Sequence, residues 1–555
     1  MKDTNYIHEQ VGPYQLYLFE RIPKDTLDFS DSIKCEKRSS KEETIKIIRE
    51  YGHIKEYYFD DPLGKIILEV DNIPKFENIL HDIFLRTGWN PQLRSPSISG
   101  MVSKARRIIY SNENRYQFLK DLGRKITKNC ETEFCRLEFL GSSKEVGRAG
   151  ILVHTNNSSV CLDFGINVAT KERPYVIPDL KHNFYGVVLS HAHLDHSGSI
   201  PFLFQEGMDF PIYGTEPTLF LMYLLCKDFE KIAKLNATPS YSKHDIKKML
   251  TRYIALNYRK RVKIAPDIEM ELVNSGHIPG SSAVLLYIKN HVLLYTGDFN
   301  TRKTRILNPM EADLPKIDYL ITECTYFDRA LPSQKEAEKE IVQLCNDTVS
   351  NDGIALIPTF AVGRSQEVLT FLHDYEIKGS LYVDGMIREA TKIIQSSPEF
   401  LRREIRTQSL TWVWGELERQ EAMNNTNVIL TTSGMLTGGP IYTYLKKCHD
   451  DPQNALILVG YQVEGTPGRA IIEGARKIVI DGEEIELKLQ LYQVRLSGHA
   501  DRGGIWNFIK SLTSLKGVFA VHGSEENCVN LAKRVKEKLD IEAHAPSNLD
   551  AYRLF

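Results

Sequence analysis

The residues best suited to chemistry form one short cluster, in which three histidines and one aspartate fall within six consecutive positions. They are His191, His193, Asp195 and His196. An apolar run at residues 185–189 precedes them and predicts a buried strand. The cluster should therefore lie at a strand end, where α/β sheets bind ligands. Because neutral imidazole and carboxylate suit zinc, and adjacent sets can hold two ions, the spacing favours a metal site over a surface histidine tract.

Other polar side chains also follow apolar runs that predict strands, namely His277, Asp298, Glu323, His499 and His522. We predict that one metal ion is held by His191, His193, His277 and Asp298. A second would be held by Asp195, His196, His522 and a bridging Asp298. Two ions about 3.5–4 Å apart activate water and stabilise displacement at phosphorus. We expect Asp195, Glu323 and His499 to be catalytic: Asp195 as a ligand, His499 as the acid for the leaving oxygen, and Glu323 to orient His499 or raise its pKa.

Phosphate binding is predicted at two glycine-containing turns. Arg364 follows Gly363 at a predicted helix start, and Ser433 and Gly434 follow a predicted strand. Helix N-termini and glycine turns present N–H groups to anions, so Arg364, Ser433 and Gly434 are candidate phosphate-binding residues, with ordinary turn chemistry as the alternative. Basic stretches at residues 101–128, 258–263 and 402–403 fit either phosphate contact or plain solvated surface.

The bulk composition limits the classes of function. The net charge of the 555 residues is −2, so affinity for nucleic acid must come from local basic patches. None of the nine cysteines stands in a Cys-x-x-Cys pair, and we expect them to be reduced. No apolar run approaches the ~18–20 residues of a membrane span, and the N-terminus lacks an apolar signal core. We therefore expect a cytoplasmic protein without membrane contact.

The chain is too long for one core, and the pattern of predicted strands and helices changes along its length. Residues 40–95 predict a small unit of strands and two helices, and residues 101–128 a basic helix. The sequence from about residue 134 predicts mainly strands, and from about residue 328 strands alternate with helices. Near residue 490 the pattern found after residue 134 returns. The alternating part predicts parallel βαβ units.

With these residues assembled, the chain resembles the metallo-β-lactamase/β-CASP nucleases, most of all the archaeal CPSF-type ribonucleases implicated in transcription termination. The motifs that carry the resemblance are residues 190–201, 359–367, 432–440, 497–501 and 545–554. The resemblance implies an α/β fold: an αββα lactamase sandwich interrupted by a parallel α/β β-CASP domain and preceded by a small α+β KH-like domain. It places the family's ligands, acidic motif and proton donor on the residues named above. RNA-acting members are similar in having histidine at the position of His522.

The expected division is a short N-terminal remnant (1–39), a degenerate KH-like domain (40–95), a basic helical linker (96–133), the first lactamase half (134–327), the β-CASP domain (328–489), and the second lactamase half with the tail (490–555). The remnant and the KH-like domain depart from the family pattern. No Gly-x-x-Gly occurs in residues 1–133, and residues 70–76 stand where that loop would be. This argues against clamp-type nucleic-acid binding there.

The resemblance implies a ribonuclease with two zinc ions per subunit, acting in transcription termination or in RNA 3′-end processing or decay. Cleavage would leave 3′-hydroxyl and 5′-phosphate ends, and both endonuclease and 5′-to-3′ exonuclease activity fit the motifs. The implied partners are RNA, a second copy bound through the C-terminal region, and RNA polymerase or its elongation factors. The alternatives are a catalytically silent RNA-binding scaffold subunit, a DNA nuclease and a small-molecule hydrolase.

Overall fold

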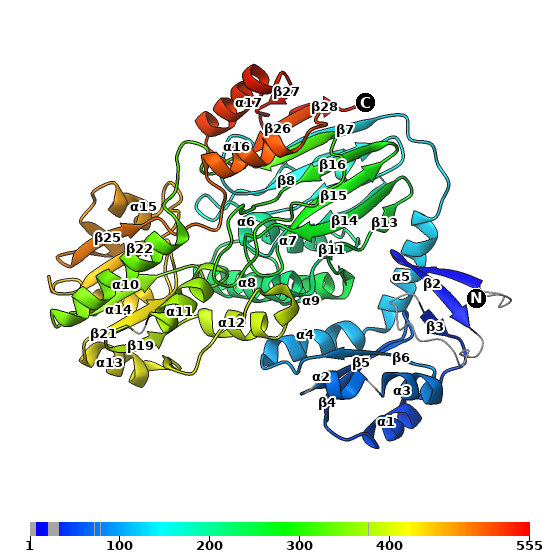
Figure 1. Cartoon of the computed structure of the whole chain (residues 1–555), viewed down its shortest axis with the longest axis horizontal. Coiled ribbons are helices and arrows are strands. Elements are labelled where there is room, and N and C mark those ends of the chain that lie inside the picture. The colour runs from blue at the N-terminus through cyan, green and yellow to red at the C-terminus, as the bar shows by residue number, and fades with distance from the viewer. Residues whose placement is uncertain (1–6, 20–32, 72, 78, 182, 376) are drawn as a thin grey trace.

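The computed structural model describes residues 7–19, 33–71, 73–77, 79–181, 183–375 and 377–555 (Figure 1). Its largest part is a sandwich of two seven-stranded sheets. The first has the order β12-β11-β10-β9-β8-β7-β28, with bounds β7 Cys135–Gly141, β8 Gly150–Thr155, β9 Ser159–Leu162, β10 Phe184–Val188, β11 Ile212–Gly214, β12 Tyr253–Ala255 and β28 Ala551–Arg553. The second has the order β13-β14-β15-β16-β17-β26-β27, with bounds β13 Val262–Ala265, β14 Ile268–Asn274, β15 Ser282–Ile288, β16 His291–Tyr295, β17 Tyr319–Glu323, β26 Gly517–Val521 and β27 Glu542–His544.

A hydrophobic core fills the space between the two sheets, with Val153 from the first and Leu286 and Phe519 from the second. The outer face of the first sheet packs against α7 (Ile200–Gln205), α8 (Glu216–Leu235) and α9 (Lys243–Arg252), and that of the second against α16 (Arg502–Ser511) and α17 (Glu525–Leu539). Short helices α6 (Leu194–Ser197) and η1 (Pro178–Lys181) lie in the connections. The predicted αββα arrangement is confirmed.

A six-stranded sheet lies to one side of the sandwich, and every neighbouring pair in it is parallel (Figure 1). Its order is β20 (Leu410–Trp412), β19 (Ser380–Val383), β21 (Asn427–Thr431), β18 (Ala355–Pro358), β22 (Ala455–Val459) and β25 (Gln490–Val494). Its helices are α10 (Gln334–Ser350), α11 (Arg364–Asp374), α12 (Ile387–Gln395), η2 (Pro398–Phe400), α13 (Glu416–Asn424), α14 (Ile441–Cys448) and α15 (Pro467–Ile472), and β23 (Lys477–Ile480) and β24 (Glu483–Glu486) form a hairpin. The predicted boundary at residue 489 separates β25 from the sheet with which it pairs.

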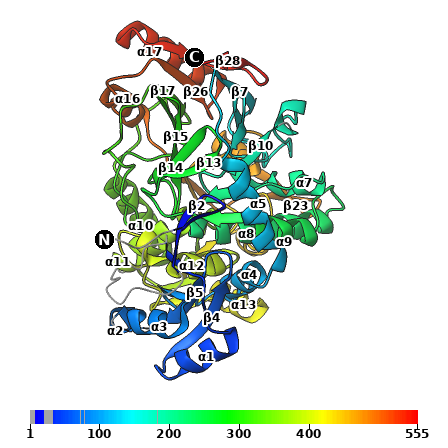
Figure 2. The same cartoon turned by 90° about the vertical axis from the view of Figure 1, so that its right-hand side faces the viewer.

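The N-terminal region holds two small sheets below the sandwich (Figure 2). One contains β1 (Ile7–Val11), β2 (Tyr14–Phe19) and β3 (Ile33–Cys35); the other contains β4 (Ile54–Asp60), β5 (Lys65–Val70) and β6 (Asn90–Arg94), with helices α1 (Lys41–Arg49), α2 (Ile73–Glu77) and α3 (Leu80–Thr87). Within the stretch predicted to replace the Gly-x-x-Gly loop, Asn72 lies outside the described residues. The KH-like assignment and the domain boundaries stay predictions.

The stretch over residues 101–128 is helical as predicted, but it forms two helices rather than one continuous helix. The structure has α4 (Gly100–Tyr110) and α5 (Glu113–Ile126), separated at Ser111 and Asn112. Asn112 has an extended backbone (φ −84°, ψ 104°). Serine and asparagine side chains compete for backbone hydrogen bonds and so favour helix ends over helix interiors. Within the described ranges, no helix combines the length and the apolar character needed to cross a bilayer.

Candidate active site

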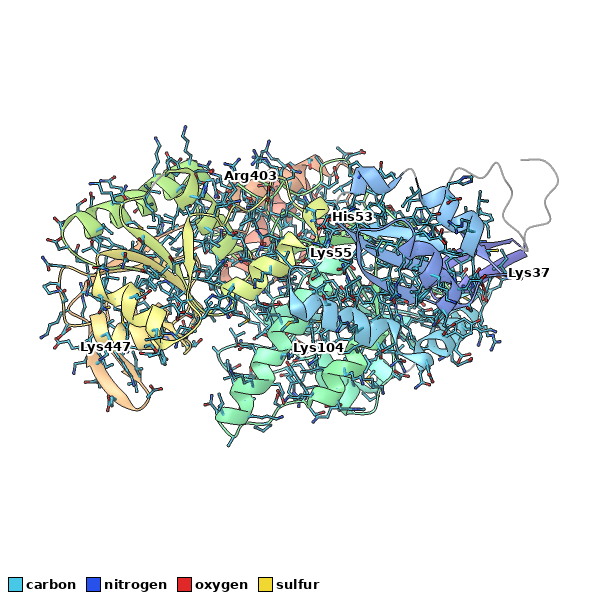
Figure 3. The ribbon with its side chains drawn as sticks, turned by 90° about the horizontal axis from the view of Figure 1, so that it is seen from below. Lys37, His53, Lys55, Lys104, Arg403 and Lys447 are labelled. Carbon is cyan, nitrogen blue, oxygen red and sulfur yellow. The ribbon has the colours of Figure 1, made fainter. Side chains whose placement is uncertain are left out.

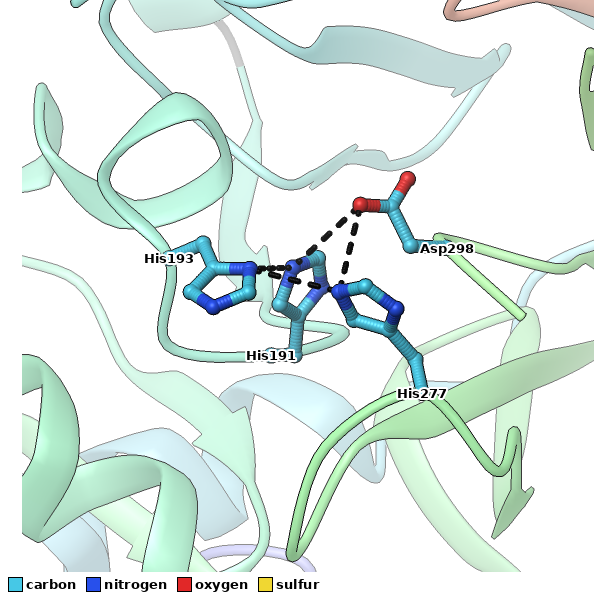
Figure 4. A group of neighbouring side chains, drawn as sticks. All are labelled: His191, His193, His277 and Asp298. Atoms are coloured by element: carbon cyan, nitrogen blue, oxygen red, sulfur yellow. Dashed lines mark hydrogen bonds and ion pairs between the residues drawn. The ribbon is translucent and has the colours of Figure 1, made fainter. Parts of the chain in front are cut away.

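The predicted site residues come together because several strands end at one edge of the sandwich. β16, β17 and β26 run parallel, so Asp298, Glu323 and His522, which follow or end them, meet at the same side. His277 lies in the turn from β14 to β15. The cluster after β10 enters from the first sheet, and Figure 4 shows His191 and His193 facing His277 and Asp298.

Backbone contacts hold the histidine cluster in place. The N–H groups of Phe164 and Ile166 donate to the carbonyl oxygens of His196 (2.8 Å) and Leu194 (2.8 Å). Gly165 lies between them, and a Cβ atom there would be 1.7 Å from the carbonyl oxygen of Asp195. Only glycine permits this approach, so residues 163–166 fix the helix turn that carries the cluster.

The first predicted ligand group is compact. The ligand atoms of His191, His193, His277 and Asp298 all lie within 4.8 Å of one another. His193 Nδ1 is 3.2 Å from His191 Nε2 and 3.3 Å from His277 Nε2. Asp298 Oδ2 is 3.6 Å from His191 Nε2 and 3.5 Å from His277 Nε2. Three imidazole nitrogens and a carboxylate oxygen converging in this way match the donor set of a zinc site.

The second predicted group adjoins the first through Asp298. His196 Nε2 lies 3.4 Å from Asp298 Oδ2, and His522 Nδ1 lies 3.1 Å from Asp298 Oδ1. Asp195 Oδ2 is 3.5 Å from His522 Nε2 and 3.9 Å from His196 Nε2. Asp298 thus faces both groups, as its predicted bridging role requires.

No role was predicted from the sequence for Asp163, which directly follows β9. The fully buried Asp163 carboxylate accepts hydrogen bonds from Ser190 N–H (2.7 Å), Ser190 Oγ–H (2.7 Å), Tyr295 O–H (2.7 Å) and His196 Nδ1–H (2.8 Å). Binding Nδ1 leaves Nε2 of His196 as the ligand atom. His277 Nδ1–H similarly donates to the Gly498 carbonyl (2.9 Å). Such partners orient metal-binding imidazoles and fix their tautomers.

The charge states also suit metal binding. Burial lowers the pKa of His191 and His277 well below the ordinary value and lowers that of His193, so all three are neutral at pH 7. Burial acts in the same direction on His196, but the carboxylates of Asp298 and Asp195 outweigh it and raise the pKa of His196 to about 10. A divalent cation bound between these carboxylates and imidazoles would replace such a proton.

Three ligand atoms are left unsatisfied in the protein alone. His196 Nε2, Asp298 Oδ1 and His522 Nε2 are buried and have no hydrogen-bond partner among the described residues. Buried polar atoms are rarely unpaired in native proteins. The residues therefore fit two divalent cations, and their nitrogen and oxygen donors suit zinc.

His499 and Glu323 form a pair beside the two groups. His499 Nδ1 lies 2.9 Å and 3.0 Å from the two carboxylate oxygens of Glu323, which is itself buried. Burial opposes protonation of His499, but Glu323 and Asp298 raise its pKa above the ordinary value. Asp298, Glu323 and His499 also form a group within 4.8 Å, so a further metal ligand is the alternative role for His499.

A cavity of about 770 Å³ joins this site to the parallel sheet. Its lining includes metal-site side chains together with Arg364, Ser433 and Gly434. Arg364 lies close to the site, because it packs against Gly498, whose carbonyl binds His277. A Cβ atom on Gly498 would be 2.8 Å from Nη2 of Arg364. Burial lowers the pKa of Arg364, and its guanidinium has no ion pair or hydrogen bond to a described residue. A partly buried cation without an ion-pair or hydrogen-bond partner is suited to binding an anion, although the Glu367 carboxylate acts on it electrostatically.

The basic stretches contribute less to such a surface than their sequence suggests. Arg106 is buried against Glu69 and Glu216, and Arg115 donates to the carbonyl oxygens of Thr251 and Tyr253. In the other two stretches, Arg261 pairs with Glu269 (2.6 Å) and Arg403 with Asp374 (2.9 Å). Figure 3 shows Lys37, Lys104, Arg403 and Lys447 spread along the lower face rather than gathered in one patch.

Comparison with known proteins assigns the family. Three family models match: a metallo-beta-lactamase superfamily domain at residues 152–318, a Beta-Casp domain at 365–471, and a Zn-dependent metallo-hydrolase RNA specificity domain at 484–546. The transcription termination factor FttA of Pyrococcus abyssi is 36% identical over 562 residues, which cover 92% of this chain and 87% of that protein. The chain belongs to the FttA family of metallo-β-lactamase/β-CASP proteins.

Other FttA proteins are similar to the same extent. The factor from Methanosarcina mazei is 36% identical, covering 92% of this chain and 88% of its own length, and that from Lokiarchaeum is 36% identical, covering 93% and 88%. Membership of this metallo-hydrolase family implies that the chain binds a divalent metal ion, and the histidine and aspartate clusters provide the donors.

Proposed function

We propose that this FttA-family chain is a two-zinc ribonuclease that hydrolyses phosphodiester bonds of RNA and acts in transcription termination. The observation that carries the proposal is a single cavity lined both by side chains of the two ligand groups and by Arg364, which has no ion pair among the described residues. The RNA specificity model spans His499 and His522, which favours RNA as the substrate. The relatives' name supports the role in termination.

The mechanism follows from the charges around the cavity. Bound in the two groups, zinc ions would lower the pKa of water and stabilise displacement at phosphorus. Arg364 would hold the phosphate oxygens, with Ser433 Oγ and the Gly434 N–H as further donors. Glu323 holds Nδ1 of His499, so Nε2 is left to protonate the O3′ atom as its bond to phosphorus breaks. The products are one fragment with a 3′-hydroxyl and one with a 5′-phosphate.

Partners belong to the same proposal. A termination factor must reach the transcript, so we propose contacts with RNA polymerase or its elongation factors, and a homodimer formed through the C-terminal region. The rival scaffold function predicts that ligands are missing, whereas every predicted ligand is present and faces its group.

Substitution of a ligand tests the proposal directly. His193→Ala and Asp298→Ala should each lower cleavage of a labelled RNA by at least about 100-fold, because each removes a donor of the first group. His244→Ala, which changes an exposed histidine of α9, is the matched control and should cleave normally. Gel electrophoresis of the RNA, circular dichroism and elemental analysis for zinc give the readouts. RNA cleavage at the wild-type rate by folded His193→Ala would refute the metal assignment.

Two further assays define the reaction. Matched RNA and DNA strands distinguish a ribonuclease from a DNA nuclease. An RNA with a blocked 5′ end distinguishes the two modes of cleavage: internal fragments mean endonuclease, and full protection means 5′-to-3′ exonuclease.

A further inference from the structure

An exposed tryptophan lies beyond the cavity, at the edge of the parallel sheet that carries the phosphate-binding candidates. Trp414 follows the edge strand β20 by two residues, and 62% of its surface is exposed. Tryptophan is highly buried on average because its ring carries a large apolar area, so an exposed one is a candidate contact for a ligand. Neither the ligand groups nor the cavity lining includes it.

The sheet order places Trp414 on the same edge as the cavity. All six strands are parallel, so the segments that follow them lie along one edge. Met386, which follows β19, and Ser433, which follows β21, both line the cavity. β20 is the neighbour of β19 and two strands from β21. Strands are about 4.8 Å apart, so the segment carrying Trp414 starts about 10 Å along the edge from the Ser433 turn.

Two cations face the indole ring, and both come from α12. The guanidinium carbon of Arg388 is 3.6 Å from the ring centroid, and Lys392 Nζ is 5.2 Å from it. Arg388 is held there because it donates to the carbonyl oxygen of Val413 (2.7 Å). Neither cation has a carboxylate partner among the residues that the structure describes.

The acidic residues nearest in sequence are engaged elsewhere. Glu389 accepts a hydrogen bond from Ser99 Oγ. Glu416 pairs with Arg419 (3.8 Å), and Glu418 accepts from the Gly415 N–H (3.0 Å). None of these carboxylates forms an ion pair with Arg388 or Lys392, so the two cations beside Trp414 remain able to attract phosphate.

We propose that Trp414, Arg388 and Lys392, which we call the Trp414 platform, stack one base of single-stranded RNA and neutralise its phosphate outside the cavity. The inference rests on the proposed ribonuclease function and extends it by naming a second substrate contact. Aromatic stacking suits any base, and basic side chains supply the backbone contact. A protein partner would have to bury two unpaired cations with the ring, which costs free energy, so RNA is the favoured occupant.

Kinetics of the full-length, zinc-loaded enzyme test the platform. With a single-stranded RNA longer than the cavity, Trp414→Ala should raise KM about 10-fold and change kcat far less, because a stacking contact is lost away from the reacting atoms. Trp414→Phe should recover most of the affinity. Leu417→Ala is the matched control, since Leu417 is 75% exposed on the adjoining α13 and lies outside the platform.

A second measurement isolates stacking from folding. A series of RNAs carries one abasic nucleotide at successive positions. At one position the missing base should raise the KM of the wild type about 10-fold. The same RNA should not raise the KM of Trp414→Ala further. Arg388→Gln should weaken RNA binding and reduce its salt dependence by about one phosphate contact. Should Trp414→Ala not fold, Arg388→Gln and the abasic scan of the wild type still give the result, because a wild-type KM unchanged at every abasic position overturns stacking.

The outcomes separate the two proposals. Wild-type enzyme that cleaves RNA while Trp414→Ala shows an unchanged KM overturns the platform alone. Loss of binding to purified RNA polymerase with unchanged RNA kinetics overturns it in favour of a protein-docking role. Wild-type enzyme that cleaves no RNA overturns the proposed function first.

Discussion

At the scale of single residues, the site is organised by hydrogen bonds that select one nitrogen on each imidazole. Asp163 binds Nδ1 of His196, the Gly498 carbonyl binds Nδ1 of His277, and Glu323 binds Nδ1 of His499. In each case Nε2 is left for the site. A hydrogen bond to Nδ1 thus orients His196 and His277 as metal ligands and His499 as a proton donor for the leaving oxygen. Because the geometry is the same, the two roles need separate tests.

Zinc content and rate together distinguish these roles for His499. His499→Ala should keep two zinc ions per chain and lower kcat by about 10²–10⁴-fold, because only the general acid is lost. Glu323→Gln should lower kcat in the same way, since it no longer holds a charged partner for the imidazole. Elemental analysis and single-turnover cleavage are the measurements. A loss of one zinc ion from His499→Ala would instead make His499 a ligand.

At the scale of elements, a buried ion-pair network fastens the N-terminal unit to the sandwich. Arg106 on α4 is 1% exposed and pairs with Glu69 of β5 and with Glu216 at the start of α8. Val102 and Ala105 of the same helix enter the core that α8 and α9 form. The main role of α4 is therefore to attach the N-terminal unit to the sandwich, and only its exposed side chains are free for other contacts.

Removing one member of this network should be costly. Arg106→Ala leaves the buried Glu69 carboxylate with the Ser97 N–H but without a cation, and should lower the free energy of unfolding by about 3–5 kcal/mol. Arg107→Ala is the control, because Arg107 is 65% exposed in its ion pair with Glu56 and should cost at most about 1 kcal/mol. Urea denaturation, followed by tryptophan fluorescence, measures the unfolding of the N-terminal unit through the buried Trp89. Equal losses in the two variants would contradict the structural role of Arg106.

At the scale of the whole molecule, the metal ligands come from both sheets of the sandwich and from both sides of the parallel domain along the chain. His191 follows β10, Asp298 follows β16, and His522 follows β26 after the whole parallel domain has intervened. Bound metal would therefore connect segments that the sequence separates. Binding to the folded state alone raises stability by mass action.

Metal removal should show this connection. EDTA treatment should abolish RNA cleavage and lower the melting temperature, since zinc present at about 1,000 times its Kd contributes roughly 4 kcal/mol. Readdition of zinc should restore both properties. In His277→Ala the zinc-dependent shift measured by calorimetry should shrink, because one donor is gone. Identical melting curves for wild type with zinc and with EDTA would oppose the two-metal proposal.

The sequence by itself determined many of the strands, the parallel βαβ units and the identity of the site candidates, while the layered sandwich was implied by the family resemblance. The apolar run at residues 185–189 is a local signal, and it agrees to within one residue with β10 (Phe184–Val188). Polar residues directly after such runs had to lie at strand ends, so His191, Asp298 and His522 could be grouped before any distance was known.

Only the tertiary structure decided which partners these residues meet. Asp163 reaches His196 across 33 positions, Arg106 is buried by Glu69 and Glu216, β25 pairs with β22, and the order of the parallel strands leaves Trp414 exposed at an edge. Burial, pairing and exposure depend on contacts between segments far apart in the chain. Residue type and local spacing carry no information about which distant segment will cover a side chain.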